Sequence, residues 1–356
     1  MDLSVYKKFI RLFALAAALL LFMAASVIVV FDPFYHYHGP AFGLKAVVTK
    51  SEYQCIGTIR NFDYDSVLCG SSTAENYNNH WFDEAFGANT VKAIKSSGTT
   101  ADLNYYLEEA FASHEVKNVF YSLDLFALDG NPQTNFVNDS MPLYLFDHDI
   151  FNDVKYVLNK DVLFEDVPYM LAMNFVGEYD EGTSYNWWQY KTFSEKETLS
   201  HYERSKEIQP ALKREEYLPR VDGNLDLIEQ MVTEHQETEF YFFLPPYSFL
   251  WWDSVSRSGQ VEEYLYAREQ VMNRLTGYEN VNIFDFQSED EVVLNLDNYM
   301  DPIHFSADVN HFMVEEAADE NSEYRITKEN RAEKLQRMEM LVNTILSEKI
   351  DQYFKP

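Results

Sequence analysis

The stretch Asp65-Ser66-Val67-Leu68-Cys69-Gly70-Ser71-Ser72-Thr73-Ala74-Glu75 decides the fold of this chain. Its first five residues form a short apolar run, which is typical of a strand buried on both faces. A glycine and three hydroxyl residues follow, and a strand-to-helix turn of this kind can place a serine oxygen at the carboxyl edge of a sheet. Alternatively, Ser71 and Ser72 cap the helix that comes next.

Similar apolar runs, rich in β-branched and aromatic residues, recur along the chain. They cover residues 91–94, 118–123, 240–244 and 281–284. Segments with helical spacing of apolar residues lie between them, at 101–113, 225–235 and 261–275. Because strands and helices alternate, we predict an α/β fold with a parallel sheet flanked by helices. Chemistry is then expected at the carboxyl ends of the strands.

Two regions depart from this alternation. Residues from about 130 to 220 contain apolar and acidic patches but no clear strand period. We interpret them as an insertion, which either covers the site or forms a helical subdomain that recognises something large. The tail from Ile326 to Phe354 has apolar positions three and four residues apart, which predicts a C-terminal amphipathic helix packed on the body.

The N-terminus contains a candidate membrane anchor. Leu12 to Phe31 is a run of 20 residues without a charge, long enough to cross the roughly 30 Å hydrocarbon layer. The basic residues Lys7, Lys8 and Arg11 precede it, which predicts a cytoplasmic N-terminus. A cleaved signal peptide is the alternative, since Ala24-Ala25-Ser26 suits a peptidase. The apolar run continues to Phe31, so we expect residues 1–31 to form a retained anchor and residues 32–356 an extracytoplasmic domain.

Composition excludes one broad class of function. The 356 residues include 58 acidic and 28 basic residues, a formal net charge of −30, which argues against binding to nucleic acid. Cys55 and Cys69 lie on the exported side, where a disulfide is possible, but we favour two buried thiols because Cys69 ends the first strand. His36 and His38 could share a metal, yet their flanking tyrosines favour an interfacial aromatic belt. We therefore expect neither a metal nor a cofactor.

A second motif lies far along the chain, at Asp301-Pro302-Ile303-His304. Asp301 and His304 are three residues apart, so the carboxylate can accept a hydrogen bond from one imidazole nitrogen while the other nitrogen faces outward. A serine hydroxyl needs such an oriented base before it attacks a carbonyl carbon. Together with Ser72, this motif predicts a nucleophile, a base and an orienting acid. The alternative is a surface loop that happens to hold an Asp–His pair.

In these motifs the chain resembles the SGNH (GDSL-like) hydrolases and acyltransferases. That resemblance spans about residues 64–310 and implies a three-layer αβα sandwich of flavodoxin-like type. It assigns Ser72 as the nucleophile, His304 as the base, Asp301 as its partner and Gly98 as the glycine of the second block. The Gly-Ser-Ser form and the N-terminal anchor look most like the membrane-anchored branch, which includes the D-alanyl-lipoteichoic-acid and alginate O-acetylation proteins.

One position departs from the family pattern. Where the third block of the family has an asparagine, this chain has Asp124. An ionised carboxylate cannot donate a hydrogen bond to an oxyanion. The oxyanion would then depend on backbone N–H groups, those of Ser72 and Gly98, unless burial keeps Asp124 protonated. Alternatively, Asp124 binds substrate or caps its loop.

Aromatic residues follow the fourth predicted strand. Two prolines and Tyr247 come directly after it, and Trp251 and Trp252 follow closely. Flat aromatic faces at the rim of a site would suit stacking on sugar rings, and the Trp187-Trp188 pair offers the same chemistry. Because the chain contains 27 Phe and 25 Tyr residues, core packing is the competing interpretation.

The motifs and the resemblance together predict a function. We expect a membrane-anchored extracytoplasmic serine acyltransferase or esterase that acts on a cell-envelope polysaccharide or teichoic-acid-like polymer. In the transferase version the acyl group, which we expect to be acetyl, comes from a polytopic membrane O-acyltransferase. The alternative from another class is a catalytically inactive SGNH-fold scaffold or polymer-binding surface protein.

Overall fold

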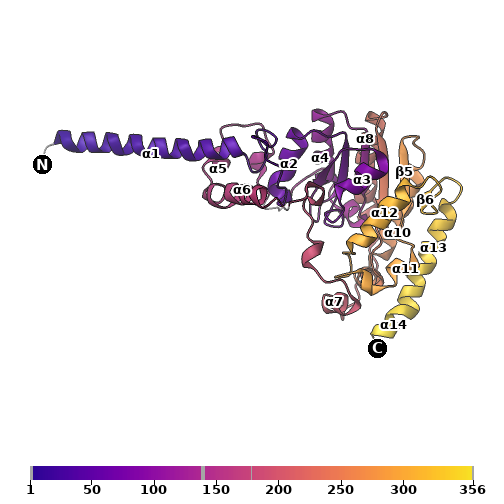
Figure 1. Ribbon diagram of the computed structural model, residues 1–356. Coiled ribbons are helices and arrows are strands. Elements are labelled where there is room, and N and C mark those ends of the chain that lie inside the picture. The colour runs from indigo at the N-terminus through magenta and orange to yellow at the C-terminus, as the bar shows by residue number, and fades with distance from the viewer. Residues whose placement is uncertain (1–2, 138–140, 178, 355–356) are drawn as a thin grey trace. The chain divides into compact units, whose positions relative to one another are not determined.

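A computed structural model describes residues 3–137, 141–177 and 179–354 (Figure 1). By compactness the chain divides into two units. Unit 1 comprises residues 1–62 and 140–181, and unit 2 comprises residues 63–139 and 182–356. The segment 140–181, half of the predicted insertion, is thus grouped with the N-terminal residues. The boundary expected at residue 31 stays a prediction.

Unit 2 is built on a six-stranded sheet with the strand order β2-β1-β3-β4-β5-β6. The strands β1 to β5 are parallel, and β6 pairs antiparallel with β5 at one edge. The direction of winding reverses between β1 and β3, and open α/β sheets place their ligands at such a switch point. The strands are β1 (Ser66–Gly70), β2 (Thr90–Ile94), β3 (Asn118–Ser122), β4 (Glu239–Leu244), β5 (Val281–Asp285) and β6 (Arg325–Ile326).

These bounds confirm the five strands predicted from apolar runs. Strand β6 was not predicted, because two residues are too few to show a period of two. It occupies the start of the predicted tail helix, which is therefore a correction: the helix begins only at residue 331. Pairing of Ile326 with Ile283 explains the difference, since the partner strand supplies the hydrogen bonds that a helix would otherwise make.

The helices of unit 2 connect and pack against these strands. Helix α8 begins at residue 214, which is 11 residues before the helical segment predicted at 225–235. The insertion predicted to end at about residue 220 therefore ends at residue 213. The helices are α3 (Asn79–Phe86), α4 (Thr100–Ser113), α7 (Glu195–Ser200), α8 (Arg214–Glu234), α9 (Phe249–Arg257), α10 (Val261–Leu275), α11 (Asp290–Val293), α12 (Ala307–Ala318), α13 (Arg331–Thr344) and α14 (Ile350–Tyr353).

Aromatic residues of β4 pack on both faces of the sheet in the core of unit 2. Phe240 contacts Phe111 of α4, with 6.3 Å between ring centroids. Phe243, on the opposite face of the strand, contacts Phe82 of α3 at 6.2 Å. Because successive residues of a strand point to opposite faces, one strand packs against both helices. The unit is a mixed α/β structure, and its description as a three-layer sandwich stays a prediction.

Unit 1 contains the N-terminal helix and five shorter helical segments. Helix α1 is long and apolar enough to span a membrane, a property that it shares with signal sequences. Cys55 of unit 1 and Cys69 of unit 2 are both buried thiols, as the sequence suggested. The segments are α1 (Leu3–Phe31), α2 (Ser51–Asn61), η2 (Leu143–Leu145), α5 (Val154–Val157), the π-helical turn η3 (Val162–Asp166) and α6 (Val167–Val176).

The stretch that follows α1 makes hydrogen bonds within unit 1. Tyr35 is buried and its hydroxyl accepts a hydrogen bond from the Val47 N–H at 2.6 Å. His36 Nε2 lies 3.2 Å from Asp153, and His38 Nε2 lies 3.0 Å from the Val29 carbonyl. The two histidines therefore have separate protein partners within unit 1. An interfacial role for them stays a prediction.

Candidate active site

The predicted nucleophile lies in a tight turn that follows β1. We call residues 70–77 the nucleophile turn. Gly70 ends the strand beside Ser122 of β3, and a Cβ added at Gly70 would lie 2.6 Å from the Ala74 Cβ, so only glycine fits there. Ser72 is partly exposed, whereas Ser71 and Thr73 on either side of it are buried. The turn thus presents one hydroxyl, that of Ser72, at the carboxyl edge of the sheet.

The three side chains predicted from two motifs far apart in the sequence lie close together here. Ser72 Oγ lies 2.8 Å from His304 Nε2, across 232 residues of chain. His304 Nδ1 lies 2.7 Å from Asp301 Oδ2. These are the contacts of a hydroxyl nucleophile, a base and an acid that orients the base. Helix capping by Ser71 and Ser72 does not occur, because α3 begins at Asn79 and is capped by Asn78.

The Asp301 carboxylate is held on both of its oxygens. While Oδ2 faces the imidazole, Oδ1 accepts hydrogen bonds from the backbone N–H groups of Ile303 and His304, at 2.8 and 2.9 Å. Burial alone would raise the pKa of Asp301, but the hydrogen bonds and charge of His304 and the Ile303 amide outweigh it and lower the pKa. The carboxylate is therefore ionised and fixed, as an orienting group must be.

Asp124 lies beneath the nucleophile turn as a buried acceptor. Its carboxyl group accepts hydrogen bonds from the hydroxyls of Ser71 at 2.5 Å, Thr73 at 3.0 Å and Tyr247 at 2.7 Å. Burial raises the pKa of Asp124, and these three donors work against that rise. Both oxygens are thus engaged by the turn and by Tyr247. This geometry favours the loop-organising role among those open for Asp124.

We expect Asp124→Ala to lower the free energy of unfolding by about 2 kcal/mol, because it leaves three buried hydroxyls without their acceptor. Asp124→Asn should cost less than half as much, since the amide keeps an oxygen acceptor and the hydroxyls can rotate. Denaturant unfolding of the full chain in detergent measures both. Equal losses for the two variants would show that the acceptor oxygen is not what the turn requires.

The backbone groups expected to bind an oxyanion differ in their availability. Within the described parts of the chain, the Ser72 N–H has no protein acceptor. The Gly98 N–H donates to the Lys95 carbonyl at 2.8 Å, within the turn that follows β2. A Cβ at Gly98 would meet that same carbonyl at 2.8 Å, so the turn itself requires glycine. Donation by Gly98 to a substrate stays a prediction.

Trp187 packs directly on the predicted base. Its ring meets the imidazole of His304 edge to face, with 5.3 Å between centroids and an angle of 85° between planes. The indole N–H donates to Glu75 Oε2 at 2.6 Å, and the backbone N–H donates to Asn76 Oδ1 at 3.1 Å. Trp187 therefore links the nucleophile turn to the base. Trp188 is more exposed, and contact of either ring with a polymer stays a prediction.

The buried side chain of Lys92 connects residues 184–187, the segment that carries Trp187, to the nucleophile turn. Lys92 Nζ lies 2.8, 2.6 and 2.5 Å from the carbonyl oxygens of Glu75, Tyr77 and Ser184 and 2.7 Å from Asn186 Oδ1, so its three N–H groups are shared among four acceptors. Burial lowers the pKa of Lys92 well below its ordinary value, and the Glu75 carboxylate opposes that shift. Sequence reasoning missed this residue, because a lysine in an edge strand is ordinarily solvent-exposed.

The aromatic residues after β4 lie in the interior. Trp251 and Trp252 are 6% and 1% exposed. Trp251 packs against the rings of Tyr247 and Tyr264, with centroids 4.4 and 5.0 Å away. Neither tryptophan presents a face on which a sugar could stack, so the placement favours core packing, the other interpretation that the sequence allowed. Tyr247 contributes through its hydrogen bond to Asp124.

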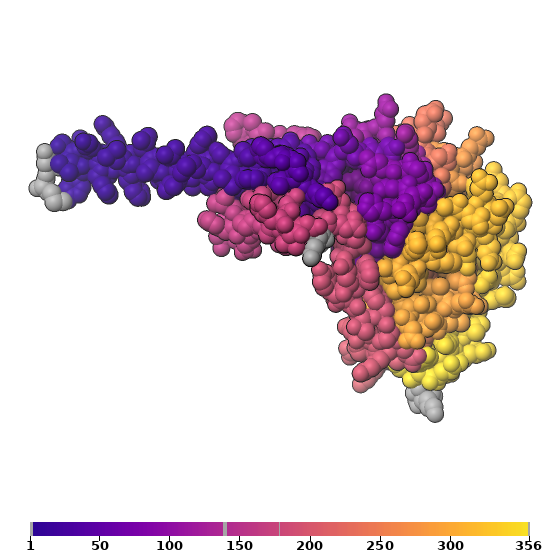
Figure 2. Space-filling view, in the orientation of Figure 1, coloured from indigo at the N-terminus to yellow at the C-terminus, as the bar shows by residue number. Residues whose placement is uncertain are grey.

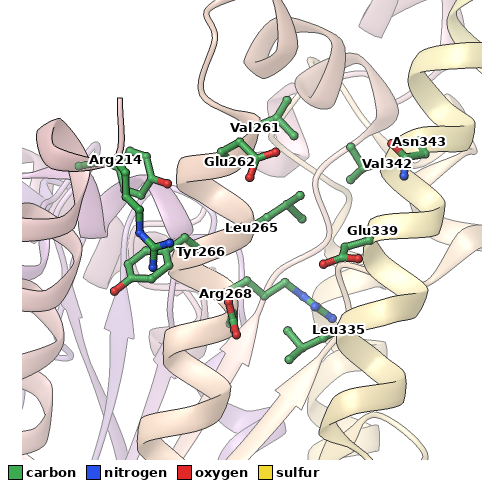
Figure 3. A pocket seen from close by; sticks show the side chains of 12 residues that line it. Arg214, Val261, Glu262, Leu265, Tyr266, Arg268, Leu335, Glu339, Val342 and Asn343 are labelled. Carbon is green, nitrogen blue, oxygen red and sulfur yellow. The ribbon is translucent and has the colours of Figure 1, made fainter. Parts of the chain in front are cut away.

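A separate cavity of about 470 Å³ lies between α10 and α13 (Figure 3). Figure 3 shows Leu265 and Arg268 of α10 pointing toward Leu335 and Glu339 of α13. The Arg268 guanidinium is buried and donates to Asp285 at 2.5 Å, which makes it a structural ion pair. None of the predicted site residues lines this cavity. Across the described ranges, no group of three His, Cys, Asp or Glu side chains could hold a metal ion.

Comparison with known proteins gives little further information. No family model matches the chain, and no curated protein matches it. Among solved structures, the chain is similar to one described as "The structure of a putative platelet activating factor from Streptococcus pneumonia". That likeness has a TM-score of 0.38 and 12% identity, over 85% of this chain and 96% of that chain. Similarity at this level defines neither a shared activity nor a shared family.

Proposed function

We propose that this protein is a membrane-anchored extracytoplasmic serine acyltransferase or esterase of SGNH type, acting on a cell-envelope polymer. The observation that carries the proposal is the relay from Ser72 through His304 to Asp301, with contacts of 2.8 and 2.7 Å. It lies at the switch point of a mostly parallel sheet, and a helix that is long enough to span a membrane precedes it in the sequence. The Gly70-Ser71-Ser72 and Asp301-x-x-His304 motifs support the same assignment.

The geometry supports a two-step acyl transfer. Ser72 Oγ bonds to the acyl carbon while its proton moves to His304 Nε2, and the resulting oxyanion lies against the Ser72 N–H. When the bond to the leaving group breaks, Nε2–H protonates the leaving oxygen. An acceptor hydroxyl then gives its proton to Nε2, attacks the acyl-serine and releases the Ser72 hydroxyl. With water as the acceptor the same steps give ester hydrolysis.

Reaction with a fluorophosphonate probe tests the nucleophile. In the full chain the Ser72 oxygen should displace fluoride and become phosphonylated, and mass spectrometry should place the adduct on Ser72. Ser72→Ala should abolish labelling, whereas Ser96→Ala, which removes an exposed hydroxyl in the turn after β2, should leave it intact. Labelling that persists in Ser72→Ala would remove Ser72 from its role.

The acceptor distinguishes transfer from hydrolysis. With an activated acetyl ester as donor, an oligosaccharide should be acetylated and should speed release of the acyl-enzyme if the protein is a transferase. Free acetate as the main product would identify an esterase. The proposed membrane partner is a polytopic O-acyltransferase that supplies the acyl group on the outer side of the membrane.

One alternative has specific support. Asp124 is an acceptor rather than an amide donor, and the Gly98 N–H is already bonded to Lys95. Loss of a single oxyanion donor can cost about 10²–10³ in rate, so a catalytically inactive scaffold that binds polymer is the second candidate. A chain that binds envelope polymer but does not react with fluorophosphonate would establish that candidate.

A further inference from the structure

Unit 1 exposes large apolar side chains next to the end of α1. Five of them are at least 73% exposed: Phe42, Ile150, Phe151, Phe164 and Phe175. We call these five residues the apolar surface. Soluble proteins seldom leave so many large apolar side chains in water, because each square ångström of apolar surface exposed to water costs about 25 cal/mol of free energy. These side chains therefore call for a covering that the described residues of unit 1 do not provide.

The surrounding segments share this character. Helix α6 has the sequence VPYMLAMNFV, yet only Val167 and Met170 are buried. A helix that is apolar around most of its circumference belongs in a protein core or in a lipid environment. Because most of α6 is outside the core of unit 1, lipid is the covering that matches it.

Most of the apolar surface belongs to segments that contact α1, and Phe175 belongs to a helix bonded to the segment that follows α1. The Phe42 ring lies 6.3 Å from the ring of Phe31, the last residue of α1. Phe164 belongs to η3, which contacts α1, and Ile150 and Phe151 lie three to four residues before α5, which also contacts α1. Phe175 follows Asn174, whose amide oxygen accepts a hydrogen bond from the Lys45 N–H at 2.7 Å. Figure 1 shows α5 and α6 beside the last turns of α1.

Within the described residues, no flexible linker separates α1 from the rest of unit 1. Asp32 comes directly after the helix, and its buried carboxylate accepts hydrogen bonds from the N–H groups of His36, Tyr37 and His38 at 3.0, 2.7 and 3.0 Å. The Tyr156 hydroxyl donates to the same carboxylate at 2.8 Å. The rest of unit 1 is therefore fastened to the C-terminal end of α1, and the depth of α1 in a membrane would set the depth of these residues.

The length of the helix then fixes where the apolar surface lies. If Arg11 marks the inner edge of the hydrocarbon layer, the 20 residues from Leu12 to Phe31 rise about 30 Å and bring Phe31 to its outer edge. Phe42, whose ring lies 6.3 Å from that of Phe31, is then within reach of the boundary between headgroups and acyl chains, into which apolar faces insert by about 5–10 Å. Figure 2 shows, on the face drawn, magenta side chains from residues 141–177 next to the last turns of α1.

We propose that unit 1 is a lipid-binding unit, which inserts the apolar surface into the outer leaflet of the membrane that α1 spans. The inference goes beyond the proposed chemistry and depends only on α1 being a retained anchor. It commits to lipid acyl chains as the occupant, rather than to the membrane helices of a protein partner.

Photolabelling of the full chain in nanodiscs tests this inference. The probe is a phosphatidylcholine with a diazirine in its acyl chain, and mass spectrometry locates the adducts. We expect adducts in α1 and in the peptides that contain Phe151, Phe164 and Phe175. Ile208 and Met340 of unit 2 are matched controls, since they are 72% and 57% exposed but belong to the other unit. Their peptides should carry at least fivefold less label.

Variants sharpen the test without risk to the fold, because the altered side chains are exposed. Phe151→Asp together with Phe175→Asp should reduce label in their peptides at least threefold and leave label in α1 unchanged, whereas Ile208→Asp should change neither. Label in α1, with none above the controls in the peptides that contain Phe151, Phe164 and Phe175, would overturn the inference and assign the surface to a protein partner. Absence of label from α1 would overturn the anchor and the inference together, while fluorophosphonate labelling of Ser72 would remain a separate result.

Discussion

Replacing Asp301 with asparagine is expected to slow the phosphonylation of Ser72 by about 10⁴-fold. The reason lies in the two oxygens of the carboxylate. Oδ1 accepts two backbone N–H groups, so an asparagine must keep its oxygen on that side. Its NH₂ group would then face His304 Nδ1, which can accept that hydrogen bond only when the ring proton is on Nε2. An imidazole in this tautomer cannot take the proton of Ser72.

The measurement is the second-order rate constant for reaction with fluorophosphonate. Asp308→Asn is the matched control, because Asp308 is an exposed acid in the first turn of α12, four residues beyond His304. That control should react within about twofold of the unaltered protein. If Asp301→Asn reacted as fast as Asp308→Asn, the orientation of His304 would not depend on Asp301, and the relay would be wrong.

The pH dependence of the free energy of unfolding provides a second test of Asp301→Asn. The pKa of Asp301 is lowered in the folded state, so its ionised form contributes stability at pH values above 3.8, its ordinary pKa. That contribution is lost as the pH falls through the lowered pKa. Asp301→Asn should remove this part of the acid sensitivity, which unfolding at pH 7 and pH 3 would measure.

Replacing Lys92 with methionine is expected to lower the free energy of unfolding by about 4 kcal/mol. Methionine fills a similar volume but donates no hydrogen bond, and three carbonyl oxygens and one amide oxygen then lose their donor in a buried place. The segment that carries Trp187 would also lose its tie to the nucleophile turn. We therefore expect the reaction of Ser72 with fluorophosphonate to slow about tenfold below the unfolding transition.

Lys117→Met is the control for that substitution. The Lys117 side chain is 72% exposed and makes a surface ion pair with Asp65 at 3.0 Å. Exposed pairs of this kind contribute about 1 kcal/mol or less, so the control should unfold nearly as the unaltered protein does. Equal effects of the two substitutions in denaturant unfolding would show that the four oxygen atoms do not depend on Lys92.

The sequence predicted the features that short-range patterns encode. Five strands were found because buried parallel strands appear as continuous apolar runs, and the pairing of Asp301 with His304 was found because it depends on a spacing of three residues. The approach of Ser72 to His304 follows from topology, since the carboxyl ends of parallel strands meet at one edge. These are cases in which local patterns and chain order suffice.

Other features depend on contacts that no local pattern encodes. Lys92 occupies an edge strand, and only the return of the chain at Ser184 and Asn186 covers it. The burial of Trp251 and Trp252 depends likewise on packing against Tyr247 and Tyr264. The division into two units could not be predicted, because segment 140–181 rejoins residues that precede it by about a hundred positions.

The Asp301–His304 turn separates two kinds of contact in the candidate site. Asp301 and His304 come from one short loop, closed by the Met300 N–H donating to the His304 carbonyl at 3.0 Å and by the bridge between Tyr299 and Phe305. The 2.7 Å contact between the two side chains is therefore made within the loop, whereas the 2.8 Å contact between Nε2 and the Ser72 oxygen depends on how the loop packs against the rest of unit 2. A substitution that shifts the loop should lengthen the second contact and leave the first nearly unchanged.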